Sequence, residues 1–504
     1  MTRLHVLSVP LRAAESLLRL AWVLVLATIG SASAGLQVPL VVAIVGGGLV
    51  LALAYQALYY RRFEYGLTGD TFDVRSGVLS RRVREIPFRR VQNVDVSRNA
   101  VQRALGVAEL RVETAGGGET EAVLRYVAID EARRLQNELG RRGRDEGGET
   151  DERGEPEPAA LFSLSPHELV VLGFTALDLR FVSVLFVGIT VVAPGLAARL
   201  EPAPGTAIVA APLLLAGVYL VAAAVSGVVS MTNYYGFRLS RVGDELRYER
   251  GLVQHFAGTI PQAKVQTLTV RSNVLARALG YASLAVETAG YAPGDADRST
   301  VVPIARRPRV LALTRSIEAF EDVAFDDATF ERPPPRARTR YAARYAVALA
   351  VLVALAVAVD RATPFRLAWY LPLVLLPVVP VAAHVKWRHR GYALLDDHVL
   401  TRNGFWIETI TVVPYYRVQT VVSSATAFQR RRDLATLTVD TAGSRRLTGG
   451  QPSAADLDAD RAADLRETVA ARLQDALAVR RTARRLRVPD SDDREDRGPA
   501  GAPG

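Results

Sequence analysis

Residues 84–116 read REIPFRRVQNVDVSRNAVQRALGVAELRVETAG, and the same pattern returns twice further along the chain. Residues 258–290 read GTIPQAKVQTLTVRSNVLARALGYASLAVETAG, and residues 411–443 read TVVPYYRVQTVVSSATAFQRRRDLATLTVDTAG. In every copy a glycine stands ten residues before the proline and a threonine stands twenty-seven after it: Gly77, Pro87 and Thr114; Gly251, Pro261 and Thr288; Gly404, Pro414 and Thr441. Spacings that hold without an insertion indicate that one folded unit has been triplicated.

Each copy has the pattern of antiparallel strands followed by a helix. In the first copy, residues 72–87 alternate in polarity and turn at Ser76 and Gly77, where a tight turn favours positive φ. Residues 91–96, 109–114 and 123–129 predict further strands, and residues 130–139 predict a closing helix. In the third copy we predict that the closing helix starts at Ser453, because Asp456 follows three residues later as in a capping box. The pattern predicts a small split barrel closed by a helix.

Long uncharged stretches precede each copy. Residues 20–60 and 202–237 contain no charged residue, and spanning a bilayer takes about 20 apolar residues. Gly, Ser and Pro interrupt the first stretch, so it predicts a pair of helices. The shorter run 181–196, which the run 169–177 precedes, forms a second pair with 202–237, and the runs 345–359 and 367–385 form a third. The run 345–359 alone also fits a buried helix of a soluble domain, but its pairing favours a span. We expect six spans in three hairpins.

Arginine placement predicts the topology. Arg61 and Arg62 follow the first hairpin, whereas its turn carries no basic residue. Basic residues near span ends favour the cytoplasmic side, and an even number of spans returns the chain to that side. We expect a multi-pass protein of the cell membrane whose N-terminus, soluble domains and C-terminus are all cytoplasmic.

These patterns divide the chain into alternating membrane and soluble parts. We predict the following order: membrane hairpin 1 (1–60), domain 1 (61–140), a flexible linker (141–160), membrane hairpin 2 (161–231), domain 2 (232–320), a linker (321–340), membrane hairpin 3 (341–386), domain 3 (387–480) and a disordered tail (481–504).

The repeated elements resemble those of a known family. The hairpin glycine, the I-P-x-x-[RK]-V-Q element and the V-[ED]-T-A-G strand are similar to the bacterial pleckstrin-homology-like (PH-like) domains of the second group. The layout of three copies among several spans resembles the YdbS/YdbT-like membrane proteins of that family. The third copy departs from the pattern, because Asp433 replaces the glycine found at Gly106 and Gly280. The resemblance implies three PH-like domains and a hetero-complex with a shorter, single-domain relative.

A shared motif follows the repeated proline in every copy. Its polar members alternate with apolar residues, so they share a strand face with part of the core. Two interpretations remain open: polar groups that are satisfied by neighbouring backbone, or contacts to a ligand. The candidate residues are Pro87, Arg90 and Gln92; Pro261, Lys264 and Gln266; and Pro414, Arg417 and Gln419.

The first copy also has a basic hairpin, formed by Arg81, Arg82, Arg84 and Arg89. These side chains could face anionic lipid headgroups, where each basic residue contributes about 1 kcal/mol. An ordinary solvated strand face is the alternative. Residues 252–260 of the second copy contain no arginine, so a lipid site common to all copies is not expected.

The sequence has no signature of catalysis. It contains no cysteine, which excludes disulfides and thiolate chemistry, and no phosphate loop, G-x-S-x-G or H-E-x-x-H motif. Asp178 and Arg180 could form an ion pair within a span, but their position favours an ordinary pair at the membrane boundary. We expect neither an enzyme nor a bound cofactor or metal, and charge patterning gives no indication of nucleic-acid binding.

The sequence thus favours a membrane scaffold whose three PH-like domains bind protein partners or the membrane surface. Three weak sites on one chain can act together through their high effective concentration. The alternative is a component of a transport or export system, which would need polar residues inside the bundle of spans. A lipid-modifying enzyme is a weaker third hypothesis, because no paired acid and base groups are evident.

Overall fold

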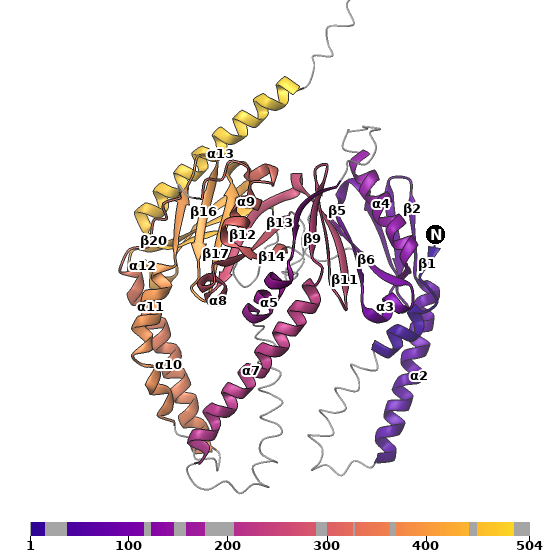
Figure 1. The fold of residues 1–504 in the computed structure, drawn as a ribbon, viewed down its shortest axis with the longest axis horizontal. Helices are drawn as coiled ribbons and strands as arrows, with labels where there is room; N and C mark the ends of the chain where they lie inside the picture. Colours follow the sequence, from indigo (N-terminus) through magenta and orange to yellow (C-terminus); the bar gives the residue numbers. More distant parts are fainter. Residues whose placement is uncertain are drawn as a thin grey trace, which may run out of the picture. The chain divides into compact units, whose positions relative to one another are not determined.

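A computed structural model describes residues 2–15, 38–114, 122–145, 158–176, 206–288, 300–325, 328–362, 369–442 and 451–487. These residues fall into two compact units, and each is described by itself (Figure 1). Unit 1 comprises residues 1–265 and 275–313, and unit 2 comprises residues 266–274 and 314–504. The predicted spans within residues 16–37, 177–205 and 363–368 lie outside the described residues, as do Asp178 and Arg180.

Unit 1 contains two sheets and the paired strands β13 and β14. The first sheet has the order β1-β2-β3-β4, and the second has the order β7-β6-β5-β11-β10-β9-β8. The strands are β1 (Thr2–Arg3), β2 (Glu64–Thr68), β3 (Thr71–Ser76), β4 (Arg82–Pro87), β5 (Val91–Arg98), β6 (Val107–Thr114), β7 (Ala122–Ala128), β8 (Ala159–Ser163), β9 (Arg238–Val242), β10 (Glu245–Arg250), β11 (His255–Pro261), and the paired β13 (Tyr281–Thr288) and β14 (Thr300–Arg306). The helices are α2 (Val38–Arg62), η1 (Phe88–Arg90), α3 (Ala100–Ala104), α4 (Ile129–Asp145), α5 (Pro166–Thr175), α7 (Thr206–Tyr234), η2 (Gln262–Lys264), α8 (Val274–Ala278) and α9 (Arg307–Thr314).

Unit 2 pairs a strand of the second repeat with the third repeat. Its strands are β12 (Val265–Asn273), β15 (Gly391–Leu394), β16 (His398–Asn403), β17 (Ile407–Pro414), β18 (Val418–Ser424), β19 (Leu434–Thr441) and β20 (Ser453–Asp458). Within unit 2, β12, β17, β16 and β15 are neighbours in that order in one sheet, and β18, β19 and β20 form another. The helices are η3 (Glu318–Phe320), α10 (Ala337–Ala362), η4 (Leu371–Leu375), α11 (Val378–Arg388), η5 (Tyr415–Arg417), α12 (Ala427–Arg430) and α13 (Ala459–Arg487).

The predicted repeat is confirmed down to single backbone contacts. The residue after each proline donates its N–H to an aspartate carbonyl in the preceding turn: Phe88 to Asp70 at 3.1 Å, Gln262 to Asp244 at 2.9 Å and Tyr415 to Asp397 at 3.0 Å. The first N–H of each closing helix binds the carbonyl of a left-handed residue: Ile129 to Gly106, Arg307 to Gly280 and Ala459 to Asp433. Asp433 therefore keeps the glycine backbone, with φ of 51°, and the third copy keeps the fold.

The hairpin glycines are required by the backbone. Gly77, Gly251 and Gly404 have φ values of 113°, 106° and 91°. A Cβ at these positions would clash with the carbonyl oxygen three residues later, that of Ser80, Gln254 or Ile407. Only glycine adopts this conformation without strain.

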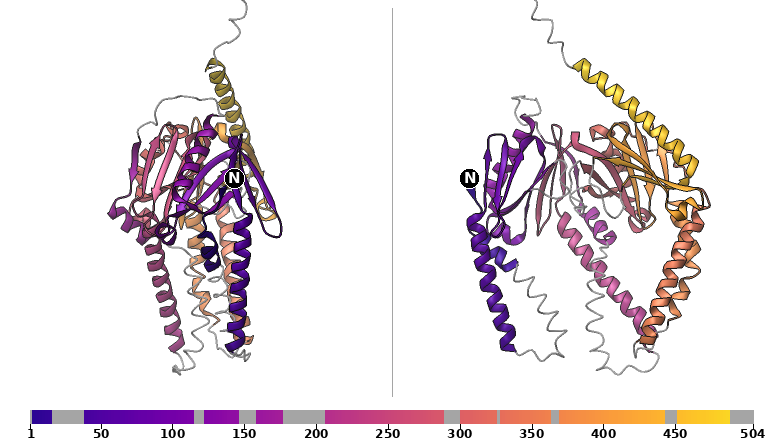
Figure 2. Two further views of the ribbon diagram at one scale, coloured as in Figure 1. Left: turned by 90° about the vertical axis from the view of Figure 1, so that its right-hand side faces the viewer. Right: turned by 180° about the vertical axis from the view of Figure 1, so that it is seen from behind.

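The first and third domains each bury one core between two sheets and the closing helix. In the first domain Phe72, Leu110 and Leu135 come from the first sheet, the second sheet and α4, and each is almost fully buried. In the third domain Val399, Leu437 and Val469 take the same roles, with α13 as the covering helix. Figure 2 shows α13 lying along the strands of unit 2. The closing helix is therefore part of the core, as the sequence predicted.

Short strands upstream of the membrane hairpins were not predicted. β1 pairs with β2, and β8 pairs with β9, although a hairpin separates the partners in the sequence. In the third copy Glu331 forms an isolated bridge with Tyr392. Each repeat therefore begins before its hairpin, and both ends of the hairpin meet in one sheet.

Several predicted boundaries differ from the structure. The prediction of a helix start at Ser453 is wrong, because Ser453–Asp458 is strand β20 and α13 begins at Ala459. α4 continues to Asp145 and β8 begins at Ala159, so both ends of the predicted linker 141–160 are regular structure. α10 begins within the predicted linker 321–340, and α13 extends into the predicted tail to Arg487. Burial explains β20, because Ala454 and Leu457 lie in the core of the third domain.

Two described helices are long and apolar enough to cross a membrane, over Ala216–Tyr234 and Ala337–Ala358. Their apolar side chains are largely exposed, for example Val347, Val351 and Leu355 at 60% or more. The core helix of a soluble protein would bury such residues, whereas lipid would cover them. α5 and α7 pack closely where Gly173 faces Gly227, since a Cβ on Gly227 would lie 2.7 Å from the Gly173 carbonyl oxygen.

Candidate functional site

In each domain, one loop contacts the end of the preceding helix. This loop leads into the strand that ends at the repeated proline, namely β4, β11 or β17. We call residues 77–80, 251–254 and 404–406 the hairpin tips. In the first domain the Arg62 Nη1 at the end of α2 donates to the Val78 carbonyl at 2.8 Å. In the second, the Leu252 N–H donates to the Thr232 carbonyl of α7 at 2.8 Å. In the third, the Phe405 ring lies 5.1 Å from that of His389, which caps α11.

The hairpin tips expose apolar side chains at these helix ends. Leu79 is 96% exposed, Val253 is 50% exposed and Trp406 is 76% exposed. Two apolar residues follow the strained glycine in every copy: Val78 and Leu79, Leu252 and Val253, Phe405 and Trp406. Large apolar side chains, and tryptophan above all, favour the interface between membrane and water. Each tip therefore places exposed apolar side chains at the end of the helix that precedes its domain.

The predicted basic residues lie on or beside the β3–β4 hairpin of the first domain. Arg82 and Arg84 lie on β4, Arg81 precedes it and Arg89 lies in η1, and all four are exposed. Their contact with lipid headgroups stays a prediction. The equivalent strands β11 and β17 contain no arginine, so any such site is specific to the first domain.

The shared motif lies at the end of the strand that carries the repeated proline, and in the second domain it contacts the first. Each proline ends a strand and is followed by a short 3₁₀ turn, which carries Arg90, Lys264 or Arg417. The Lys264 Nζ donates to the carbonyl oxygen of Val91, in the first domain, at 2.9 Å. Burial lowers the pKa of Lys264, and the charge of Glu245 partly offsets this effect. For Lys264 the structure thus favours the interpretation of a polar group satisfied by neighbouring backbone.

The glutamines of the motif differ from copy to copy. Gln266 on β12 is 5% exposed, whereas Gln419 on β18 is exposed. Gln92 lies on β5. The motif residues lie in three sets, one in each domain. A contact of these sets with a ligand stays a prediction.

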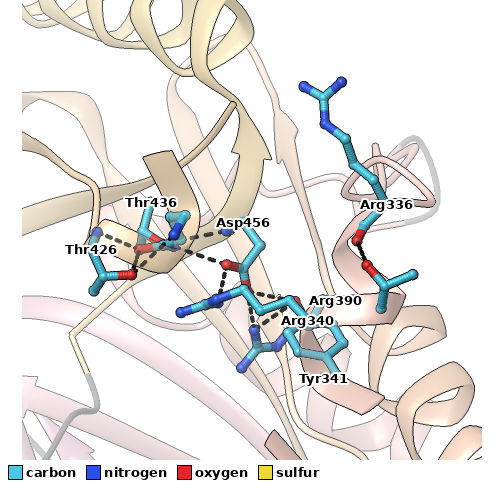
Figure 3. A network of polar contacts seen from close by, with 9 residues as sticks. Arg336, Arg340, Tyr341, Arg390, Thr426, Thr436 and Asp456 are labelled. Carbon is cyan, nitrogen blue, oxygen red and sulfur yellow. Dashed lines mark hydrogen bonds and ion pairs between the residues drawn. The ribbon is translucent and has the colours of Figure 1, made fainter. Parts of the chain in front are cut away.

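A buried ionic network joins the third domain to its membrane hairpin (Figure 3). Its centre is Asp456 of β20, which is 1% exposed and accepts from the Tyr341 hydroxyl at 2.6 Å. Arg390 donates to Asp456 Oδ2 at 2.9 Å, and Arg340 pairs with Oδ1. Gln429 of α12 donates to Oδ1 at 2.8 Å. The carboxylate thereby connects α10, the end of α11, α12 and the sheet. We call this network of Asp456, Arg340, Tyr341, Arg390 and Gln429 the ionic lock.

The first domain has a related contact at the matching position. Tyr126 of β7 and Asp456 of β20 both lie at a bulge and both have positive φ, of 64° and 62°. The Tyr126 hydroxyl donates to Glu15, and Arg125 lies 3.6 Å from the same carboxylate. Sequence reasoning missed these residues, because Glu15 and Tyr126 are 111 positions apart and follow no motif.

One surface hollow of about 300 Å³ lies beside the start of α5, and its lining includes His167, Glu168, Arg306 and Arg309. Its charged groups already have partners, since Arg309 lies 3.6 Å from Glu168 and the Glu168 carboxylate caps α5. Among the described residues, no group of three or more His, Asp or Glu side chains could hold a metal.

Comparisons with known proteins agree with the repeat. The sequence pattern of the bacterial PH domain matches residues 16–143, 179–321 and 345–473. The UPF0699 transmembrane protein YdbT of Bacillus subtilis (strain 168) is 23% identical over 418 residues, which cover 78% of this chain and 83% of that protein. No solved structure matches the chain.

Proposed function

We propose, because the chain belongs to the bacterial PH domain family, that it is a membrane scaffold that holds three PH-like domains against the membrane surface without catalysing a reaction. The observation that supports this most strongly is the position of the hairpin tips. In every repeat, the tip contacts the end of the helix that leads into its domain, and exposed apolar residues surround that contact. A domain fixed in this way keeps one end towards the lipid and leaves its sheets available to partners.

Tip contact with lipid can be tested with an environment-sensitive fluorophore. Leu79→Cys and Trp406→Cys would be labelled in turn on the cysteine-free chain, reconstituted in vesicles of phosphatidylethanolamine and phosphatidylglycerol. We expect a blue-shifted emission and strong quenching by brominated lipids. Asp70→Cys and Asp396→Cys are matched controls. These exposed residues lie in the turns before β3 and β16, at the opposite ends of these strands from the hairpin tips. Equal quenching at tips and controls would contradict the proposed orientation.

The scaffold role itself requires a partner. We expect the full chain, purified from its native membranes in mild detergent, to carry at least one other protein in a fixed ratio, measured by quantitative mass spectrometry. Effective concentration allows three weak sites to retain such a partner during purification. Recovery of the chain with no stoichiometric partner, in detergent that preserves other membrane complexes, would count against a scaffold. The tip measurement would stand independently of that result.

A further inference from the structure

Consecutive domains are joined by strand pairing, and the pairing follows one rule. β5 of the first repeat pairs antiparallel with β11 of the second, and β12 of the second repeat pairs antiparallel with β17 of the third. At each junction, the strand after one repeated proline therefore pairs with the strand that ends at the next repeated proline.

The two junctions also share one register. Ser97, ten residues after Pro87, lies opposite Phe256, five residues before Pro261. Arg271, ten residues after Pro261, lies opposite Thr409, five residues before Pro414. A slip by one residue would turn every side chain to the other face, so an identical register indicates one interface used twice.

Under this rule, one strand of the first repeat and one strand of the third repeat have no partner repeat within the chain. β4 ends at Pro87 and has the place that β11 and β17 have in their repeats, while β18 follows Pro414 and has the place of β5 and β12. Among the described strands, β4 pairs only with β3, and β18 pairs only with β19. Both edges therefore present the backbone groups that the two internal junctions use.

Side chains on both edges are exposed where their counterparts at the second junction are buried. Val83, four residues before its proline, is 53% exposed, whereas Ile410 at the same position is 4% exposed. Val422, eight residues after its proline, is 44% exposed, whereas Thr269 is 8% exposed. β18 carries no charged residue, whereas β4 carries Arg82, Arg84 and Glu85. β18 therefore lacks the charge that usually protects a free edge strand.

We propose that β18 of one chain pairs antiparallel with β4 of a second copy of this chain, in the register of the internal junctions. Ser424 would lie opposite Arg82, and Ser423 opposite Val83. A second copy is the occupant because each chain carries one edge of each kind, shaped for the same repeat. Such a head-to-tail interface builds a closed ring or an open row of chains. This proposal goes beyond the scaffold function, since it specifies how scaffolds assemble.

Membrane insertion is compatible with this geometry. Within unit 1, the first junction joins two domains whose helices α2 and α7 leave the sheets on the same side in every view (Figures 1 and 2). A junction of the same register between two chains would likewise direct the helices of both to one side. Neighbouring chains in one membrane can therefore pair without reorientation.

Cysteine cross-linking tests the register directly, because the chain has no cysteine of its own. Two chains with different tags, one carrying Arg82→Cys and the other Ser424→Cys, would be co-expressed and oxidised in native membranes. Opposed residues of an antiparallel pair have Cα atoms about 4.5–5.5 Å apart, within disulfide reach. We expect a dimer that carries both tags and dissociates in reductant. Both positions are exposed, so the substitutions leave the cores intact.

Matched controls define the outcome. Arg82→Cys with Ser423→Cys, a slip of one residue, should give at least fivefold less dimer. Thr409→Cys with Arg271→Cys in one chain should oxidise internally, since this pair occupies the same positions of an internal junction. The proposal is overturned by an absent mixed dimer when that internal pair oxidises. Dimers formed equally by either variant alone, or an adduct of another mass, would also overturn it.

Discussion

β12 and β18 are the same strand of the repeat in two different surroundings. Both follow the proline and its 3₁₀ turn, and they begin VQTLTV and VQTVVS. β12 pairs with β17 of the next repeat and is buried almost throughout, whereas β18 is exposed over most of its length. Gln266 and Gln419 occupy one motif position, yet only Gln266 is buried. The motif thus determines the strand, and the neighbouring domain determines what the strand buries.

The largest expected effect comes from placing a charge at one position of both strands. Thr267 and Thr420 each stand six residues after the proline, and Thr267 is 0% exposed while Thr420 is exposed. We expect Thr267→Asp to lower the free energy of unfolding by roughly 3–5 kcal/mol, the cost of an uncompensated buried charge. Thr420→Asp should change it by about 0.5 kcal/mol or less. Thermal unfolding of the monomer in detergent measures both, and equal losses would remove the contrast between the strands.

A similar loss is expected in the third domain when its ionic lock is broken. Asp456→Ala leaves Arg340 and Arg390 without their buried carboxylate, which should cost roughly 3–5 kcal/mol. Asp458→Ala on the same strand is the control, because Asp458 pairs with Arg336 near the surface, where such pairs contribute about 0–1 kcal/mol. Limited proteolysis between α11 and β15 would report the loosened domain. If both variants resist proteolysis equally, the ionic lock does not stabilise the third domain, which contains the edge strand β18.

A smaller effect should separate the two glutamines. Gln266→Ala removes a buried amide and leaves its surroundings unsatisfied, at a cost of roughly 1–3 kcal/mol. Gln419→Ala should be close to neutral, because water replaces the exposed side chain. The difference between their unfolding midpoints measures what the neighbouring strand contributes at one motif position. A neutral Gln266→Ala would show that the motif glutamine is not held by its junction.

The smallest expected effect is a pH dependence at the first junction. Burial lowers the pKa of Lys264 below the ordinary value of 10.5, so the unfolded chain binds more protons between these two values. Stability should therefore rise as pH increases through that window. Below it, the full free-energy cost of burying the charged Lys264 ammonium should be present. Lys264→Met should lack this increment. Unfolding midpoints of both chains across pH 7–10.5 test it, and parallel curves would contradict a desolvated Lys264 ammonium.

Much of the fold was predictable because its signals are local. The strained glycines, the proline before each 3₁₀ turn and the alternation of β5 and β6 act within a few residues, so their spacing in the sequence revealed three copies. The Ser453 prediction failed for the same reason: a serine followed by an acidic residue is a local signal, and pairing of β20 with β19 outweighed it.

The candidate surfaces were predictable only in part. The motif carrying Lys264 and Gln266 was identified, but its place at a junction between domains was not. The acceptor for Lys264 is Val91, which lies 173 positions away. The apolar residues at the hairpin tips can be identified in the sequence, whereas the contact of each tip with a helix end depends on tertiary packing.

The sequence by itself determined the repeat, most strands around the repeated proline and the apolar stretches of the membrane hairpins, because these follow from backbone preference and from apolar length. Only the tertiary structure decided which edge of each domain meets the next, which strands begin ahead of a hairpin, and which of three equivalent residues is buried. Backbone groups on a strand edge are alike in every copy, so pairing between them leaves no mark in the local sequence. The register that joins two domains became visible only when both were folded.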